Sequence, residues 1–395
     1  MESGTWPAIT YESRAWQRNG DEIASRRELR RAHGDYLAAV PPSIRHARVD
    51  LSPATLALAD DASRELIRFD AEAGAVAAPF ASILLRTESA SSSEVEQLTS
   101  SAKQVALAEI GASRSGNANL VVANVAAMTA AIEHAGRLDE QTIIAMHDAL
   151  LRDTAPQYVG RWRQEQVWIG GGSISPHAAT FVPPHHEHVP ALMADLVAFV
   201  ERTDVPVLAH AAIAHAQFET IHPFPDGNGR TGRALLQGML RTTGVTRDVT
   251  VPVSAGLLSD LDGYFDALGA YRDGRVDEIV ETVAEASFAA IRNGRTLVRD
   301  LQQVSERWRD AVAARSDASV HRLRDLLLRQ PVVNTRTVVA ALEVSEVAAQ
   351  NAIDRLVAAG VLTKAAGGER YRIWQAPEVL DALDAFAARA RRRRP

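Results

Sequence analysis

The sequence predicts a mainly α-helical protein with one small β segment near its middle and a separate C-terminal domain. Apolar residues recur every three or four positions over most of the 395 residues, which is the pattern of amphipathic helices. Residues 158–184 break that pattern, because Trp, Val, Ile and Phe side chains flank three consecutive glycines there, as in a β-hairpin. Beyond residue 319, short helical stretches precede two β-like stretches around a Gly367-Gly368 tip, which indicates a second domain.

The composition narrows the class of protein. Hydrophobic residues make up 46% of the chain and charged residues 23%, as in ordinary soluble globular proteins. The absence of cysteine excludes disulfides, Cys-type zinc sites and thiol catalysis. No apolar run is long enough for a membrane span, and residues 1–6 lack the character of a signal peptide, so we expect a cytoplasmic protein. The formal net charge of −6 argues against a nucleic-acid surface along the whole chain.

The predicted helices follow one another with short breaks. Asp139 suits the N-terminal cap of the helix that it precedes. The serine-rich residues 89–93 suit either a linker or a helix start. Before the C-terminal domain the predicted helices cover residues 21–37, 59–73, 79–85, 97–134 with a break at 111–119, 138–151, 189–203, 205–220, 230–240, 260–270 and 278–305.

Twelve consecutive residues, His222-Pro-Phe-Pro-Asp-Gly-Asn-Gly-Arg-Thr-Gly-Arg233, hold the groups needed to bind a magnesium nucleotide and transfer part of it. Prolines at 223 and 225 exclude a helix interior or a central strand, so His222 and Asp226 are predicted to lie on a loop. The glycines that follow can turn N–H groups toward an anion at the start of a helix. Arg230 and Arg233 project from one face of that helix, and each guanidinium suits phosphate oxygens.

Two other interpretations of this stretch explain less. Residues 227–232 also fit the dinucleotide fingerprint G-x-G-x-x-G, but that fingerprint needs a preceding strand, which Pro223 and Pro225 prevent. A glycine turn between two helices with solvated arginines would not explain why a histidine, a carboxylate, three glycines and two arginines coincide.

The same twelve residues resemble the signature of the Fic family, His-x-Phe-x-Asp/Glu-Gly-Asn-Gly-Arg-x-x-Arg, at every specified position. Residues 166–170 and 181–184 look like the family's flap, with Trp168, Ile169 and Gly170 as its leading residues. Residues 214–219 look like the helix that precedes the family's catalytic loop. The resemblance implies a mostly helical enzyme that transfers AMP from ATP to a hydroxyl side chain of a target protein.

The resemblance also assigns roles. His222 would take the proton from the incoming hydroxyl, since imidazole titrates near neutral pH. Asp226 would bind Mg²⁺, a hard cation that takes carboxylate and phosphate oxygens. Phe224 would anchor the loop in the core. The residues that would hold the phosphates of ATP are Gly227, Asn228, Gly229, Arg230 and Arg233.

A regulatory segment is the next implication of the resemblance. Many Fic proteins carry Ser/Thr-x-x-x-Glu-Gly/Asn on a helix, and Ser92-Ser-Glu-Val-Glu96-Gln97 looks like it except at Gln97. Glu96 paired with Arg233 would occupy the group that should hold the γ-phosphate, and the α-phosphate would be misaligned. The alternative is a solvated glutamate in a serine-rich loop.

The remaining polar and aromatic side chains near the motif are expected to be structural. His215 and Glu219, four apart on a helix, could share a metal, but no third ligand is near in sequence. We expect surface or packing roles for His185, His186, His188, Trp168 and Phe181.

Residues 319–376 resemble a winged helix-turn-helix domain. Its predicted helices cover residues 321–329, 334–342 and 346–359, with Ser345 capping the last, and its strands cover 361–363 and 371–374. Gln350 on the recognition helix is the expected base-facing residue. Eight basic and eight acidic residues between 319 and 388 make the domain neutral, and only the arginines of 389–394 form a basic tail. We therefore favour protein docking or dimerisation over DNA binding.

Together these features predict a Fic-type helical core with a small β-hairpin flap and a C-terminal winged helix-turn-helix. The predicted segments are an N-terminal helical region (1–100), the catalytic core (101–300), a helical linker (301–318), the winged helix (319–376) and a C-terminal helix with a basic tail (377–395).

The expected activity is adenylylation of a Ser, Thr or Tyr hydroxyl with Mg²⁺ and ATP, autoinhibited by Glu96. The expected partners are ATP and a target protein, which can be the chain itself; a homodimer stays open. Open alternatives are AMP removal or another phosphoryl transfer on the same scaffold, and a nucleotide-sensing transcriptional regulator. His222 argues against the regulator, because binding phosphate needs no base.

Overall fold

Helices dominate the computed structural model, which describes residues 6–16, 32–75, 79–134, 136–171, 174–312, 318–366 and 372–392. The chain divides into two compact units, each assembled from segments far apart in sequence. Unit 1 combines residues 1–61, 130–243 and 262–284, and unit 2 combines residues 62–129, 244–261 and 285–395. Three helices each contribute residues to both units, namely α2 (Pro53–Ala75), α5 (Gly116–Glu133) and α12 (Val276–Ala311). Within the described ranges, no helix is both long and apolar enough to cross a membrane.

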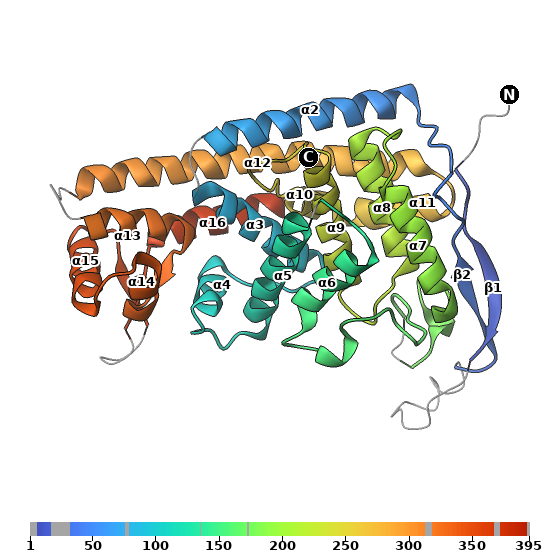
Figure 1. The fold of residues 1–395 in the computed structure, drawn as a ribbon, viewed down its shortest axis with the longest axis horizontal. Coiled ribbons are helices and arrows are strands. Elements are labelled where there is room, and N and C mark those ends of the chain that lie inside the picture. The colour runs from blue at the N-terminus through green and yellow to red at the C-terminus, as the bar shows by residue number, and fades with distance from the viewer. Residues whose placement is uncertain are drawn as a thin grey trace. The chain divides into compact units, whose positions relative to one another are not determined.

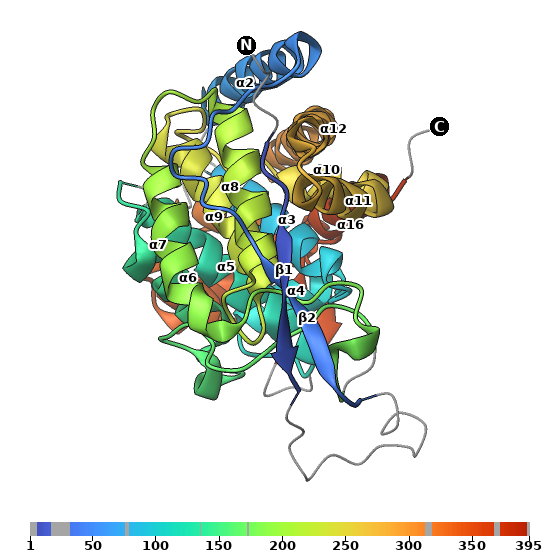
Figure 2. The ribbon, with the colours of Figure 1, turned by 90° about the vertical axis from the view of Figure 1, so that its right-hand side faces the viewer.

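Unit 1 pairs a group of helices with a two-stranded antiparallel sheet (Figures 1 and 2). The strands β1 (Thr10–Ala15) and β2 (Asp35–Val40) run from Thr10 opposite Val40 to Ala15 opposite Asp35. Helix α8 packs against α7 and α9, and α9 also packs against α6. The helices of this unit are α6 (Glu140–Leu151), α7 (Val189–Val200), α8 (Val207–Ile221), α9 (Asn228–Thr242) and α11 (Leu261–Arg272), with 3₁₀ turns at Pro156–Tyr158, Pro176–Ala178 and His186–His188.

Helix α8 is the centre of unit 1, because every residue from Leu208 to Ile221 is buried. Its alanines at 209, 211, 212, 214 and 216 have no exposed surface, and such small side chains allow neighbouring helices to approach closely. A helix buried on all faces must deliver its C-terminus to a fixed place in the core. The loop that follows α8, which carries the motif, is therefore positioned by the best-packed element of the unit.

Two sequence predictions about β structure were wrong. Residues 35–37 were placed in a helix, yet they belong to β2, because alternate side chains of that strand are buried while its backbone pairs with β1. The rest of the predicted helix at 21–37 lies largely outside the described residues. Among the described residues of 158–184, the predicted hairpin is reduced to an isolated antiparallel bridge between Ile169 and Phe181. Gly170 and Gly171 have φ of +71° and +76°, which turns the backbone away from further pairing.

Unit 2 holds the remaining helices and a three-stranded antiparallel sheet in the order β3-β5-β4. In this sheet Val333 pairs with Trp374, which also pairs with Lys364. A core of Ala106, Leu107, Val332 and Leu380 joins helix α4 to this part of the chain. The elements are α3 (Pro79–Val95), α4 (Ala102–Glu109), α10 (Val253–Leu257), a 3₁₀ turn (Leu258–Asp260), α13 (Ala318–Arg329), β3 (Val332–Val333), α14 (Thr335–Leu342), α15 (Glu346–Ala358), β4 (Thr363–Ala366), β5 (Ile373–Gln375) and α16 (Pro377–Ala390).

The helices after residue 318 begin and end within about three residues of their predicted bounds. Asn334 and Ser345 cap α14 and α15 by accepting the N–H groups of Thr337 and Ala348 at 2.8 and 3.2 Å. Gly360, with φ of +75°, ends α15 as predicted. The Gly367-Gly368 tip lies outside the described residues.

The serine-rich residues 89–93 are neither a linker nor a helix start, because they lie inside α3 and are largely buried. The hydroxyls of Ser89 and Ser93 donate to the carbonyls of Leu85 and Ser89 at 2.9 Å, so the helix itself satisfies them. Asn124 of α5 donates to Ser89 O at 2.9 Å. Small hydroxyl side chains therefore suit this buried helix face. Because serine-rich segments are also typical of loops, composition alone did not reveal the helix.

Candidate active site

His222 is the first residue after helix α8, at the opening of the motif loop. It adopts the left-handed conformation with φ of +51° and ψ of +62°, and its N–H donates to Phe218 O at 2.8 Å. The imidazole is 20% exposed, and its Nδ1 lies 3.9 Å from Oε2 of Glu219. The side chain is thus accessible at the edge of a buried helix, as a base for an incoming hydroxyl must be.

Phe224 anchors the loop, as predicted. The ring has no exposed surface and stacks on His147 of α6, with centroids 3.6 Å apart and planes at 2°. Trp162 and Phe218 contact the ring from other sides. Asn228 accepts from Phe224 N at 2.9 Å and donates to Phe224 O at 2.8 Å, so its side chain holds the loop closed and only its backbone can face a phosphate.

Asp226 has the most exposed charged side chain of the motif, at 58%. Its Oδ1 accepts from Gly227 N at 2.6 Å and lies 3.5 Å from Nη2 of Arg230, while Oδ2 has no hydrogen bond within the described residues. Its backbone carbonyl accepts from Nε2 of His147 at 2.9 Å. Burial lowers the pKa of His147 to about 4, so this imidazole is neutral and keeps Nε2 as a donor. Hydrogen bonds therefore fix Oδ1 and the backbone carbonyl of Asp226, while Oδ2 remains accessible to a ligand.

Helix α9 begins directly after Gly227, whose φ is +79°. A Cβ at this glycine would lie 2.9 Å from Cδ2 of Leu150, so no other residue fits the turn without a shift. The first N–H groups of a helix have no partner within it, and those of Asn228 and Gly229 are of this kind. Arg230 and Arg233 are only 4% and 2% exposed, so the helix start carries two buried positive charges. This arrangement suits a polyanion.

The sequence did not single out Gly232, yet the site depends on it. A Cβ there would lie 2.8 Å from Oε1 of Glu219 and 2.9 Å from Cδ1 of Phe218. His215 is buried beside it, and its Nε2 lies 2.8 Å from the hydroxyl of Tyr264. Among the described residues there is no group of three or more side chains that could hold a metal ion. The side chains of His215 and Glu219 therefore lie against Gly232 of the motif helix.

The predicted flap residues lie near the sheet that the sequence did not reveal. Ile169 N donates to Phe181 O at 2.8 Å, and Trp168 packs edge-on against Trp16 at 5.5 Å. Ala39 of β2 donates to Val182 O at 3.0 Å. The guanidinium of Arg272 lies 3.7 Å above the Phe181 ring. Phe181 is buried as expected, Trp168 is half-buried, and Gly170 is exposed at the turn.

The three neighbouring histidines lie in and beside a short 3₁₀ turn, as expected for a surface loop. Nε2 of His188 lies 2.9 Å from Glu12 and 3.1 Å from Arg14 of β1. The rings of His185 and His186 are tilted by 41° with their centroids 4.1 Å apart. These contacts secure the flap's return to α7.

Arg163 is a site residue that the sequence reasoning missed. It is 3% exposed, and its Nε donates to the carbonyl of His222 at 2.8 Å. The only signal in the sequence was its position just before the flap. The contact with His222 could not be predicted, because it joins residues 59 positions apart.

The predicted regulatory segment is the C-terminus of α3. Gln97 N donates to Glu94 O at 2.8 Å and Leu98 N donates to Ser93 O at 3.0 Å, which is the Schellman pattern. Gln97 has φ of +62°, the conformation that glycine or asparagine adopts most easily. The residue that departs from the family pattern therefore adopts the backbone geometry that the pattern favours. Glu96 follows the last residue of the helix and is exposed, whereas Ser92 is fully buried.

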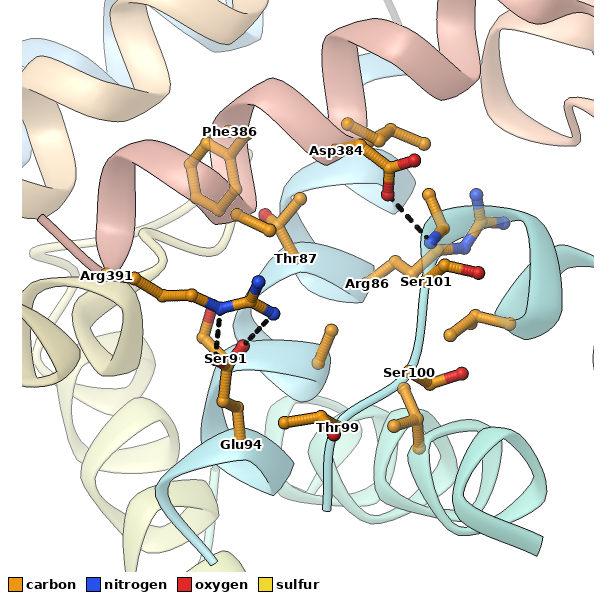
Figure 3. A pocket seen from close by; sticks show the side chains of 16 residues that line it. Arg86, Thr87, Ser91, Glu94, Thr99, Ser100, Ser101, Asp384, Phe386 and Arg391 are labelled. Carbon is orange, nitrogen blue, oxygen red and sulfur yellow. Dashed lines mark hydrogen bonds and ion pairs between the residues drawn. The ribbon is translucent and has the colours of Figure 1, made fainter. Parts of the chain in front are cut away.

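Glu94 has a different environment from Glu96. Its carboxylate pairs with the guanidinium of Arg391, just past α16, across a cavity of about 550 Å³ (Figure 3). Arg391 belongs to the predicted basic tail, and Arg389 of the same tail donates to Asn293 at 2.7 Å. The first arginines of the tail, Arg389 and Arg391, are thus bonded to Asn293 and Glu94 within unit 2.

Gln350 of α15 is half-buried, and both ends of its amide are engaged. Its Oε1 accepts from Thr335 at 3.2 Å and its Nε2 donates to Asp354 at 2.8 Å. Any contact with a DNA base would have to compete with these two hydrogen bonds.

Known proteins resemble this chain chiefly around the motif. The Fic/DOC family model matches residues 137–240, which include α6 to α9, the flap and the motif loop. The protein adenylyltransferase fic-1 of Caenorhabditis elegans is 31% identical over 153 residues, covering 38% of this chain and 27% of that protein. The probable protein adenylyltransferase aq_aa38 of Aquifex aeolicus is 37% identical over 94 residues, covering 21% of this chain and 29% of that protein.

The chain thus spans less than a third of the length of these two relatives. A solved structure of a Fic family protein from Desulfovibrio desulfuricans G20 superposes with a TM-score of 0.54 at 23% identity, covering 85% of this chain and 98% of that one. That likeness concerns the fold. Residues 137–240 of this chain are thus similar to the Fic/DOC family, and the similar proteins include ones named protein adenylyltransferases.

Proposed function

We propose that this protein is a protein adenylyltransferase that transfers AMP from ATP to a hydroxyl side chain of a target protein. The observation that supports this most is the motif loop, where an accessible imidazole precedes a helix start that holds two buried guanidiniums. Phosphate binding explains the helix start and the arginines but not the imidazole. A base is needed when a hydroxyl is the nucleophile.

In this proposal His222 takes the proton of the acceptor hydroxyl as its oxygen attacks the α-phosphorus. The bond between the α-phosphorus and the bridging oxygen breaks, and pyrophosphate leaves with that electron pair. Arg230 and Arg233, together with the first N–H groups of α9, stabilise the charge that moves onto the leaving group. The loop moves little during the reaction, because Asn228, His147 and Arg163 fix its backbone.

Asp226 fits the magnesium ion that this chemistry normally uses. Mg²⁺ is bound through one or two carboxylates together with phosphate oxygens, and Oδ2 of Asp226 is the open carboxylate oxygen of the motif. The ion, when bound, would neutralise phosphate charge. The chain contributes the position of this carboxylate through the hydrogen bonds that hold Oδ1 and the backbone carbonyl.

The test is incubation with ATP radiolabelled at the α-phosphate and Mg²⁺, followed by detection of label on the protein itself or on lysate proteins. His222→Ala should abolish labelling while ATP still binds, because the imidazole is not among the groups proposed to hold the phosphates. Asp226→Asn should weaken magnesium-dependent ATP binding and labelling together. Undiminished labelling by His222→Ala would refute the proposed base, and labelling with only γ-labelled ATP would indicate a different phosphoryl transfer.

We also propose that Glu96 inhibits the enzyme by pairing with Arg233. Three observations support Glu96 over Glu94: its place four residues after Ser92, the left-handed conformation of Gln97, and the engagement of Glu94 by Arg391. The carboxylate of Glu96 would compete with the γ-phosphate for the guanidinium.

The elements from α13 to β5 further support a winged helix-turn-helix domain, which we propose docks onto a protein. Its neutral charge balance and the engaged amide of Gln350 argue against specific DNA binding.

A further inference from the structure

One buried guanidinium is bonded to the motif loop and to both ends of the flap. Arg163 donates from Nε to His222 O at 2.8 Å, from Nη1 to Glu165 O at 2.8 Å, and from Nη2 to Pro184 O at 2.5 Å. A longer contact joins Nη2 to Ile221 O at 3.4 Å, and the backbone N–H of Arg163 donates to Pro223 O at 2.9 Å. Every acceptor is a backbone carbonyl.

This charge is buried and, within the described part of the chain, forms no ion pair. Arg163 is 3% exposed, and among the described residues no carboxylate lies within ion-pair distance of it. Burial lowers the pKa of Arg163 to about 10, so the guanidinium stays protonated at neutral pH. Burying an unpaired charge is costly, and an apolar residue would fill the same volume more cheaply. The carbonyl contacts are what an apolar residue could not supply.

The contact with His222 fixes a strained residue. The left-handed region is sterically unfavourable for a residue that carries a Cβ, and His222 lies in it with φ of +51°. The carbonyl of His222 lies where helix α8 ends, so it has no partner in the helix and needs a donor. By supplying one, Arg163 sets the peptide plane after His222 and, through it, the direction from which the imidazole leaves the backbone.

The contacts with Glu165 and Pro184 hold the two ends of the flap together. The flap leaves the body of unit 1 after residue 165 and returns at residue 184. Gln166 closes the same base by donating to Pro183 O at 3.0 Å. The donors of a guanidinium are spread over three nitrogens in a planar fork, whereas the three donors of an ammonium group all leave one nitrogen and cannot reach the same widely separated carbonyls.

We propose that Arg163 is a positioning residue that holds the catalytic base and the flap in one arrangement, so that a hydroxyl presented along the flap meets the imidazole of His222. This inference rests on the proposed function for its chemical consequence. The physical coupling of the two segments is measurable without it. Arg163 has no hydrogen bond to Asp226 or to the two motif arginines, so we expect its loss to affect nucleotide binding less than transfer.

The first experiment compares wild-type protein with Arg163→Lys, and with Arg161→Lys as a matched control at an exposed position two residues earlier. We expect Arg163→Lys to lower kcat for self-labelling with α-labelled ATP at least tenfold, while the Kd for Mg-ATP measured by calorimetry changes less than twofold. Arg161→Lys should match wild type in both. A parallel loss of ATP affinity, or wild-type kcat in a folded Arg163→Lys protein, would overturn the inference.

The second experiment is hydrogen exchange on the full chain, which does not require activity. Arg163→Lys should raise exchange together in the flap, residues 165–184, and in the loop at 222–227, with helix α6 unchanged. Added methylguanidinium should reverse the effect in Arg163→Ala. If only one segment responds, or if exchange rises throughout unit 1, Arg163 is an ordinary stabilising residue. If wild type transfers no AMP but the two segments respond together, the proposed function fails and the positioning role stands.

Discussion

Replacing Gln97 with glycine should stabilise unit 2. A side chain at φ of +62° costs about 1–2 kcal/mol, which glycine avoids. Glycine also gives the unfolded chain more freedom, which takes back roughly 0.5–1 kcal/mol. The net expectation for Gln97→Gly is a gain of about 0.5–1 kcal/mol in the free energy of unfolding, measured by urea denaturation.

The control is Gln97→Ala, which removes the same polar atoms but keeps the Cβ and its left-handed strain. The free energy of unfolding of Gln97→Gly should exceed that of Gln97→Ala by about 1–2 kcal/mol, before the greater freedom of glycine in the unfolded chain is subtracted. The firmer end of α3 should also hold Glu96 more tightly, so self-labelling should fall roughly two- to fivefold if the whole gain acts on the inhibitory pair. Equal stability of the two variants would refute the role assigned to the left-handed turn.

The remaining predictions concern inhibition, pH and the C-terminal domain. Glu96→Gly should raise self-labelling more than about tenfold if its pair with Arg233 contributes ~1.4 kcal/mol or more, whereas Glu94→Gly should not; the reverse order would transfer the role to Glu94. The folded pKa of His147, about 4, lies below the unfolded value, so the unfolded chain binds this proton first and stability falls as the pH drops from about 6.5 to 4. Urea titrations should show that the free energy of unfolding falls between pH 7.5 and pH 5.0 by about 2 kcal/mol more in wild type than in His147→Gln. Equal decreases in the two proteins would contradict the buried neutral imidazole. A chain ending before Arg389 should bind generic DNA weakly, with any binding by the full chain falling steeply with salt; tight sequence-selective binding by the shortened chain would favour a regulator.

The elements that the sequence predicted well are those specified by local pattern. Asp139 caps α6 through Thr142 N at 2.9 Å, as its position suggested, and the prolines around Phe224 place the motif on a loop. Helical periodicity located α7, α8 and α9 within about three residues. Such features depend on neighbours along the chain, so a single sequence contains them.

Features specified by distant partners could not be predicted in this way. Strand β2 is held by its pairing with β1 and by the hydrogen bond from Ala39 N to Val182 O. No local property of residues 35–40 reveals either partner. The function of Arg163 depends on carbonyls up to 59 residues away. Gly232 occupies an unspecified position of the motif, and only the structure shows that Glu219 and Phe218 of α8 leave no room for a side chain there.

The discontinuous assembly of unit 1 limits how the protein can be shortened. A fragment containing only residues 137–240 would keep the motif but lose Tyr264, the hydroxyl partner of His215, and Ala39, the donor to Val182. It would also lose Arg272 from above the ring of Phe181. An inactive or insoluble fragment of this kind would therefore report missing supports for the flap and for α8, and would carry no information about the chemistry of the intact chain.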